Sequence, residues 1–231
     1  MVPTGDSPAV PAAGQPLARP RPPRPFLALV LGGLSVVVIV LSGWLAVQPG
    51  AEKAQTGWVL WFNQPPQPFA VIFAVVNPLL RPGPMLVVTA LLIGWVLLTA
   101  AGTVQRLELL RALLVALALS ELAAQVMKRL ADQPRPLGVI PNLDTHNYPT
   151  DPHGNAYPSA HTAMVVAAVS ALWPWMKWPQ RIVGLTFAVL LACNRIYIGA
   201  HWPLDVLGGA AIGLLAGTIT WLIATRWPIC R

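Results

Sequence analysis

The stretch FLALVLGGLSVVVIVLSGWLAV at residues 26–47 holds 22 residues and no charged side chain. A helix needs about 20 apolar residues to cross the hydrocarbon core of a bilayer, so this stretch predicts a membrane-spanning helix. Three arginines at residues 19–24 precede it, an order that also occurs in secretory signal peptides. The run is long for such a leader and no clear cleavage site follows, so an uncleaved first span is favoured.

The composition of the whole chain is that of a membrane protein. Of its 231 residues, 55% are hydrophobic and 10% are charged, and the mean hydropathy is +0.61. Soluble domains carry about 25% charged residues, and disorder requires low hydrophobicity, so both classes are excluded for most of the chain. The net charge of +7 comes from basic residues that flank apolar runs. That placement indicates membrane topology and contact with membrane lipids rather than nucleic acid.

Five further apolar runs predict an all-α, polytopic bundle of six transmembrane helices over residues 26–231; these runs are 85–101, 107–127, 161–175, 182–198 and 206–224. Residues 1–25 are rich in proline and alanine and predict a disordered cytoplasmic tail. Residues 48–84 are expected to be partly interfacial, because the apolar run at 69–80 is too short to cross alone. Residues 128–158 are expected to form a polar outer loop.

The distribution of basic residues predicts the orientation. If the N-terminus is cytoplasmic, nine basic residues lie inside: Arg19, Arg21, Arg24, Arg106, Arg111, Lys177, Arg181, Arg226 and Arg231. Six lie outside: Lys53, Arg81, Lys128, Arg129, Arg135 and Arg195. Cytoplasmic loops are enriched in lysine and arginine, so we expect a multi-pass protein of the cell membrane with both ends in the cytoplasm.

With this topology, seven polar residues at the ends of the last four spans meet at the extracytoplasmic face: Lys128, Arg135, Ser159, His161, Arg195, His201 and Asp205. Ionisable groups at membrane depth are costly and usually mark a functional site. Three cations beside a helix N-terminus suit a phosphate-sized anion. The sequence contains no HxH, CxxC or carboxylate cluster typical of metal ligands, so neither a metal nor a cofactor is expected.

The two histidines differ in their sequence surroundings. Asp205 lies four residues after His201, so its carboxylate can accept a hydrogen bond from one imidazole nitrogen and leave the other free to attack. His161 has no such neighbour and suits a general acid. We therefore expect phosphoryl transfer through a phosphohistidine at His201, which water hydrolyses with the help of His161.

These residues form three motifs that resemble those of the type 2 phosphatidic acid phosphatases, a superfamily of integral membrane lipid phosphatases. The motifs read K-x6-R-P at 128–136, P-S-A-H at 158–161 and N-R-x5-H-x3-D at 194–205, and the resemblance covers residues 85–224. It implies that the phosphate is held by Lys128, Arg135, Ser159, Ala160 and Arg195. It also implies that His201 is the nucleophile, that Asp205 orients it and that His161 is the acid.

Two positions depart from the family pattern. Ala160 replaces a glycine where backbone amides approach the phosphate, and Asn194 replaces a serine beside Arg195. An alanine at a helix N-terminus can adopt the required backbone angles, and asparagine keeps hydrogen-bonding groups. We therefore expect both departures to change details of phosphate binding more than the reaction itself.

The favoured function is a metal-independent lipid phosphatase of the outer leaflet, with undecaprenyl diphosphate as the preferred candidate substrate. The alternatives are a phosphatidate or phosphatidylglycerophosphate phosphatase, a lipid phosphotransferase, and a transport or binding protein for phosphate lipids without catalysis. In the loop at 137–157, Asp144, His146, Asp151 and His153 are compatible with a metal cluster, but a solvated outer loop is favoured. Tyr148 and Tyr157 are expected at the membrane interface. The sequence leaves the oligomeric state open.

Overall fold

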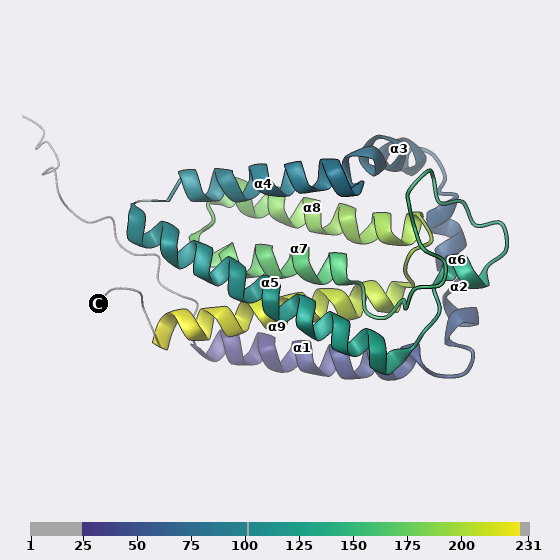
Figure 1. Cartoon of the computed structure of the whole chain (residues 1–231), viewed down its shortest axis with the longest axis horizontal. Helices are drawn as coiled ribbons and strands as arrows, with labels where there is room; N and C mark the ends of the chain where they lie inside the picture. Colours follow the sequence, from purple (N-terminus) through teal and green to yellow (C-terminus); the bar gives the residue numbers. More distant parts are fainter. Residues whose placement is uncertain (1–24, 101, 227–231) are drawn as a thin grey trace, which may run out of the picture.

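The computed structural model describes residues 25–100 and 102–226, and the fold of this part is all-helical, as predicted (Figure 1). Its elements are α1 (Pro25–Ala46), α2 (Ala51–Asn63), α3 (Phe69–Leu79), α4 (Pro82–Leu98), α5 (Thr103–Ala131), α6 (Pro136–Val139), α7 (Ala160–Leu172), a 3-10 turn (Trp173–Trp175), α8 (Trp178–Tyr197) and α9 (Pro203–Arg226). The predicted tail lies outside the described residues, except for Pro25, which begins α1.

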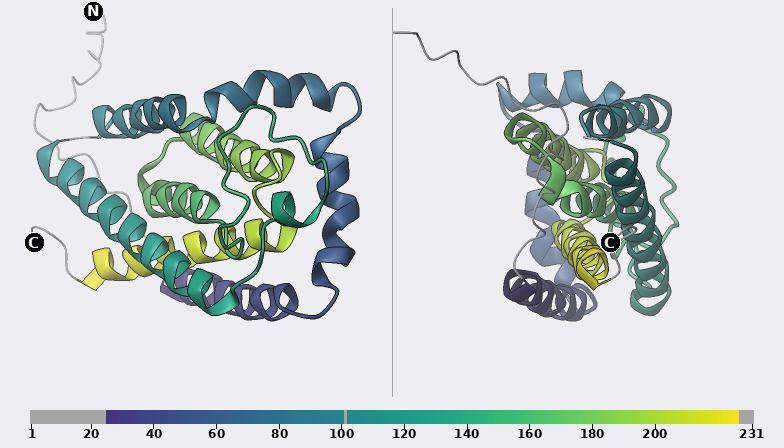
Figure 2. Two further views of the ribbon diagram at one scale, coloured as in Figure 1. Left: turned by 45° about the vertical axis from the view of Figure 1, so that its right-hand side comes forward. Right: turned by 90° about the vertical axis from the view of Figure 1, so that its left-hand side faces the viewer.

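In the described part of the chain, most of the longer helices run along the long axis of the molecule, and α2, α3 and α6 gather at one end (Figures 1 and 2). The long-axis helices are α1, α4, α5, α7, α8 and α9, and each overlaps one predicted span. Among the described residues, three helices are long and apolar enough to cross a membrane: Pro25–Ala46, Thr103–Ala131 and Pro203–Ala224. Helix α7 has only 13 residues, or roughly 20 Å against a hydrocarbon core of about 30 Å. The number of six spans therefore stays a prediction.

Helix α1 shows the side-chain pattern of a lipid-facing helix. It buries Ala28, Ser35, Ser42 and Ala46, while large apolar side chains such as Val40 are exposed. A soluble protein would bury the large apolar residues instead. In lipid, small residues mark helix contacts because they let two backbones approach closely.

The closest helix packing is between α7 and α9, where glycines at 209, 213 and 217 face α7. A Cβ atom at Gly213 would come within 2.8 Å of the Ala167 amide nitrogen and would also meet the Ala163 carbonyl oxygen. Nearby, the Trp221 indole donates to the Ser170 carbonyl at 2.8 Å. The small residues of α9 thus determine how closely it approaches the helix that begins at the predicted site.

The segments predicted as interfacial and as an outer loop contain helices and buried polar side chains. Helices α2 and α3 bury polar residues, Gln55, Asn63 and Asn77, against the rest of the protein. Helix α5 continues to Ala131, so the first four residues of the predicted outer loop are helical, and Lys128 lies in the last helical turn. Contacts of these polar side chains attach both segments to the rest of the protein, and their position relative to the membrane stays a prediction.

Candidate active site

The predicted site residues come from three stretches of the chain, one for each motif, that meet at one end of the bundle. Helix α5 ends there, helix α7 begins there, and the connection between α8 and α9 turns there (Figure 1). Hydrogen bonds tie the segments together: the Ser159 amide donates to the Asp205 carbonyl at 2.9 Å, and the Trp202 indole donates to the Pro134 carbonyl at 2.8 Å. The structure therefore brings together motifs that lie far apart in the sequence.

The turn after α8 explains the spacing between Arg195 and His201. Gly199 has a φ of +67°, a left-handed conformation that glycine adopts without steric cost, and it follows the helix end as glycine commonly does. The chain then folds back, so that the Ala200 and His201 amides both donate to the Arg195 carbonyl, at 3.1 and 3.2 Å. Five intervening residues are what this return requires, and they place His201 next to the helix end that carries Arg195.

His201 is paired with Asp205 at the start of α9. The His201 Nδ1 atom lies 3.4 Å from the Asp205 Oδ2 atom, and the same oxygen accepts the Trp202 amide at 2.7 Å. An acidic side chain at the third helical position that binds the N-cap amide is half of a capping box. Helix capping thus fixes the Asp205 carboxylate, which in turn orients the His201 ring.

His201 is 2% exposed and lies outside the helices, at the junction before Pro203. Burial, and then the positive charges of Arg195, Lys128 and Arg135, lower the pKa of His201 well below its ordinary value of 6.5. The imidazole is therefore neutral at pH 7. With Nδ1 directed to Asp205, its Nε2 lone pair is free to act as a nucleophile.

Two of the three predicted phosphate-binding cations are held by the loop 132–158. The Lys128 ammonium donates to the Asn155 carbonyl at 2.7 Å and to the Ala156 carbonyl at 3.3 Å. The Asn155 side-chain Nδ2 donates back to the Lys128 carbonyl at 3.0 Å. Arg135 donates to the Asp151 carbonyl at 3.1 Å. A Cβ at Gly154 would lie 3.1 Å from the Arg135 guanidinium carbon, so this glycine leaves room for that side chain.

The third cation, Arg195, is 3% exposed and stacks on an aromatic ring. Its guanidinium carbon lies 4.8 Å from the centre of the Tyr148 ring, and the Tyr148 hydroxyl donates to the Leu80 carbonyl at 3.2 Å. Tyr148 is 4% exposed. It therefore lies under Arg195 inside the protein, which corrects the expectation that it sits at the membrane interface.

Several buried donors at this end have no hydrogen-bond partner in the described part of the chain. They are Nε and Nη1 of Arg195, Nε of Arg135 and Nε2 of Gln133. A buried donor without an acceptor costs about 1–3 kcal/mol, and more when it is charged. An anion bound among them would satisfy them, so the site fits an oxyanion such as phosphate.

Ser159 is at the N-cap position of α7, as expected, but its hydroxyl does not cap the helix. The hydroxyl instead accepts a hydrogen bond from Thr162 at 3.0 Å, and Ser159 is completely buried. Ala160 is the first residue of the helix. The first amides of α7 have no acceptor within the helix and add to the anion-binding character of this end.

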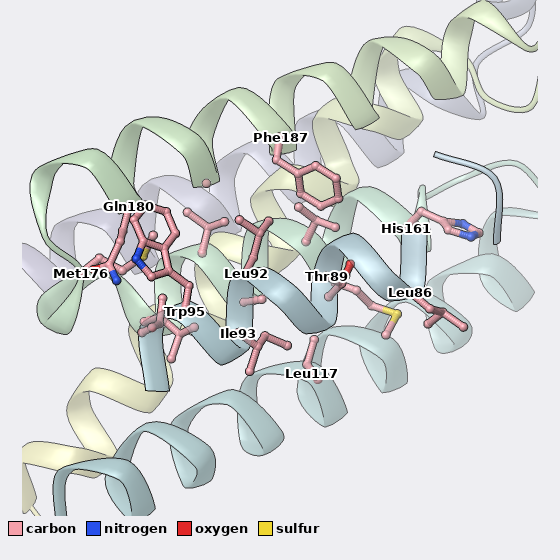
Figure 3. Close-up of a pocket in the computed structure, with 17 residues that line it drawn as sticks. Leu86, Thr89, Leu92, Ile93, Trp95, Leu117, His161, Met176, Gln180 and Phe187 are labelled. Atoms are coloured by element: carbon pink, nitrogen blue, oxygen red, sulfur yellow. The ribbon is translucent and has the colours of Figure 1, made fainter. Parts of the chain in front are cut away.

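His161 lies at the mouth of an apolar cavity of about 260 Å³ between α4, α5, α7 and α8 (Figure 3). It follows Ser159 by two residues, and the Ser159 amide donates to the carbonyl of Asp205, the partner of His201. Leu86 lies at the same end of the cavity, while Met176 and Gln180 lie at the other end. His161 thus belongs both to the end of the bundle that holds the predicted site residues and to the lining of the apolar cavity.

The loop residues that raised the question of a metal separate into two local pairs. Asp144 and His146 lie 3.3 Å apart, and Asp151 accepts the His153 amide at 2.9 Å. No group of three or more histidine, cysteine or acidic residues placed to hold a metal occurs among the described residues. His146 stacks on Tyr197 with ring centres 3.8 Å apart, so it attaches the loop to the end of α8.

The two departures from the family motifs have separate outcomes. Asn194 donates to the Asn77 side chain at 2.9 Å, and Asn77 donates to the His146 carbonyl at 3.0 Å. Asn194 therefore joins α8 to α3 and to the loop. Helix α7 begins at Ala160 itself, and the effect of its methyl group on phosphate binding stays a prediction.

Sequence reasoning missed three residues that hold the site. Tyr148 supports Arg195, Gln55 accepts the Leu204 amide at 2.9 Å, and Tyr157 shares hydrogen bonds of 3.0 Å with Ser42 and with the Ile39 carbonyl. Tyr157 is fully buried, which corrects its expected interfacial position. None of the three lies within one of the motifs. A single sequence therefore gives no reason to choose them over other polar or aromatic residues.

This chain is similar to several known proteins in sequence and in fold. A family model described as the PAP2 superfamily matches residues 109–228. An undecaprenyl-diphosphatase of Sulfolobus acidocaldarius is 35% identical over 117 residues, which are 50% of this chain and 53% of that protein. A decaprenylphosphoryl-5-phosphoribose phosphatase of Mycobacterium tuberculosis is 32% identical over 185 residues, which are 73% of this chain and 92% of that protein. The crystal structure of a transmembrane PAP2-type phosphatidylglycerolphosphate phosphatase from Bacillus subtilis matches with a TM-score of 0.60 at 17% identity, covering 88% of this chain and 98% of that one.

Proposed function

Because the chain belongs to the PAP2 superfamily of membrane phosphatases, we propose that it hydrolyses a lipid phosphate or diphosphate through a phosphohistidine at His201. The observation that carries the proposal is the pair of His201 and Asp205, 3.4 Å apart, among buried guanidinium donors that lack acceptors. A neutral, oriented imidazole surrounded by cations is suited to attack phosphorus while the developing charge is stabilised.

The candidate substrate is a polyprenyl diphosphate such as undecaprenyl diphosphate. The Sulfolobus relative is named an undecaprenyl-diphosphatase and the mycobacterial relative acts on a decaprenyl lipid. Both names refer to one polyprenyl chain attached to phosphate. The apolar cavity beside His161 supports a substrate whose tail lies next to its phosphate.

In the first step, the His201 Nε2 atom forms a bond to phosphorus and the bond from phosphorus to the leaving oxygen breaks. His161 donates a proton to that oxygen, and Lys128, Arg135 and Arg195 bind the phosphoryl oxygens. Asp205 stabilises the positive charge that develops on the imidazole.

In the second step, a water molecule attacks phosphorus and the nitrogen–phosphorus bond breaks. His161, now neutral, accepts the proton of the water, and inorganic phosphate leaves. Each half-reaction accounts for the bond that forms, the bond that breaks and the proton that moves. In both, the three cations supply the charge that stabilises the transition state.

The test is phosphate release by the purified protein in detergent with excess chelator. The panel contains undecaprenyl diphosphate, phosphatidate and phosphatidylglycerophosphate, each with and without a lipid alcohol as acceptor. We expect release from the polyprenyl substrate to be undiminished by chelator. A strict requirement for Mg²⁺, transfer to the alcohol in place of release, or phosphate binding without turnover would each contradict this function.

Tyr148 is expected to act as a positioning residue for Arg195. The variant Tyr148→Leu removes the ring under the guanidinium, a cation–π contact worth about 2 kcal/mol when desolvated, or about 30-fold. We expect vanadate, an oxyanion inhibitor, to bind about 30-fold more weakly, and KM to rise more than kcat falls. Tyr148→Phe keeps the ring and should stay within about threefold of the wild type. Equal losses in both variants would rule out this role.

We place the active site at the extracytoplasmic face and both chain ends in the cytoplasm, on the basis of the distribution of basic residues. Asp144 lies in an exposed position of the loop beside the site. In a variant without Cys193 and Cys230, Asp144→Cys should react with a membrane-impermeant maleimide on intact cells. Labelling only after the cells are opened would show that this loop is cytoplasmic and would contradict the proposed orientation.

A further inference from the structure

The apolar cavity beside His161 extends from that residue to a group of side chains farther along the bundle. Its walls come from α4, α5, α7 and α8, and most of the side chains that line it are aliphatic or aromatic. His161 and Leu86 are at one end, and Trp95, Met176 and Gln180 are at the other (Figure 3). The end at His161 is also the end near His201, because the Ser159 amide, two residues before His161, donates to the carbonyl of Asp205, the partner of His201. A lipid whose phosphate lies at His201 would therefore enter the cavity with the carbons nearest the phosphate.

The far end of the cavity is held by packing and hydrogen bonds. Met176 is 7% exposed and packs with Leu172 and Val96. Gln180 is 2% exposed; its oxygen accepts the Lys177 amide at 2.7 Å and its nitrogen donates to Thr99 at 2.9 Å. Because both ends of the Gln180 amide have partners in the protein, this residue forms a wall and offers no group for a ligand to bind.

The volume limits what can enter. An engineered protein cavity of about 150 Å³ binds benzene, which has six carbons. At the same ratio, a cavity of about 260 Å³ has room for about 10 carbons, or two isoprene units. A diacyl lipid carries two chains on one headgroup, and this space accepts at most the first part of one of them.

Building on the phosphatase function proposed above, we propose that this cavity binds the first ~10 carbons of a single lipid chain and so selects single-chain polyprenyl phosphates over diacyl phospholipids. The carbons beyond this length lie outside the cavity. Chain length should therefore matter strongly up to the capacity of the cavity and little beyond it.

The first experiment measures kcat/KM for isoprenyl diphosphates of 5, 10, 15 and 20 carbons and for phosphatidate. Each buried methylene contributes about 0.8 kcal/mol, so we expect a rise on the order of 100-fold or more from 5 to 10 carbons and less than about threefold thereafter. Phosphatidate should be at least about tenfold poorer than the 10-carbon substrate. A steady rise through 20 carbons, or equal use of phosphatidate, would overturn the proposal.

A filling variant tests the location. Ala168 lines the cavity seven residues after His161 on α7, roughly 10 Å along the helix. In Ala168→Phe we expect most of the rise between 5 and 10 carbons to disappear. Ala90 is exposed on α4, and Ala90→Phe should keep the wild-type chain-length profile. The same profile in both variants would show that the chain binds elsewhere.

A crosslinking experiment separates this proposal from the phosphatase function. A prenyl diphosphate analogue with a photoreactive group in its second isoprene unit is bound to the His201→Asn protein. This measurement requires binding but no turnover. We expect crosslinks on the cavity faces of α4 and α7. Crosslinks there without phosphate release by the wild-type protein would refute the phosphatase function and keep the cavity assignment. Phosphate release with crosslinks outside the cavity would refute the cavity assignment and keep the phosphatase function.

Discussion

Replacing His201 by asparagine is expected to abolish phosphate release, with a fall in kcat of at least about 10⁴-fold, because removal of a catalytic nucleophile costs this much or more. Asparagine keeps a polar side chain of similar reach but cannot form the phosphohistidine. The surrounding cations stay in place, so vanadate should still bind the variant. The measurement is phosphate release from a polyprenyl diphosphate together with trapping of the phosphoenzyme.

The matched control is His153→Asn, which changes an exposed histidine of the loop near the site. We expect it to stay within about twofold of the wild type, because surface substitutions usually have small effects. Turnover of His201→Asn comparable to that of the control would exclude His201 as the nucleophile. The site would then have to use another group or bind phosphate without chemistry.

Replacing Gly213 by leucine is expected to prevent stable folding. The first carbon of the new side chain would already meet the Ala163 carbonyl oxygen and lie 2.8 Å from the Ala167 nitrogen, so α7 and α9 would have to separate. Overpacking in a core costs typically 1–3 kcal/mol and occasionally more, and a clash with backbone belongs at the upper end. We expect a loss of at least ~3 kcal/mol, seen as a lower melting temperature in detergent and less monodisperse protein.

Gly33→Leu is the control for this substitution. Gly33 lies on α1, and nothing approaches within 4 Å of a Cβ built there. The variant should melt within a few degrees of the wild type, and Gly213→Ala should fall between the two. If Gly213→Leu melted like Gly33→Leu, the close packing of α7 on α9 would not be what holds the site together.

The motif residues were predictable because their spacing reflects local backbone geometry. Arg195 and His201 are separated by the number of residues that a glycine turn needs to return to the Arg195 carbonyl. His201 and Asp205 are separated by the start of a helix, where an acidic side chain binds the N-cap amide. The proximity of such pairs can be predicted from the sequence alone, because their partners are only four to six residues apart in the chain.

The supporting residues were not predictable for the opposite reason. Tyr148 reaches Arg195 across 47 positions of the chain, and Gln55 reaches the start of α9 across 149. Tyrosines in a proline-rich loop look the same in sequence whether they face lipid, water or an arginine. Burial made Tyr148 and Tyr157 internal, where the sequence had suggested an interfacial position.

By itself, the sequence determined that this chain is a helical membrane protein and which side chains its chemistry could use. Both properties follow from local rules: apolar length for a bilayer, and fixed offsets at helix ends. Only the tertiary structure decided that the three motifs meet, that Tyr148 lies under Arg195, and that an apolar cavity of about 260 Å³ opens beside His161. These properties depend on how closely helices far apart in the chain pack, and the spacing of the glycines at 209, 213 and 217 does not say which helix they contact.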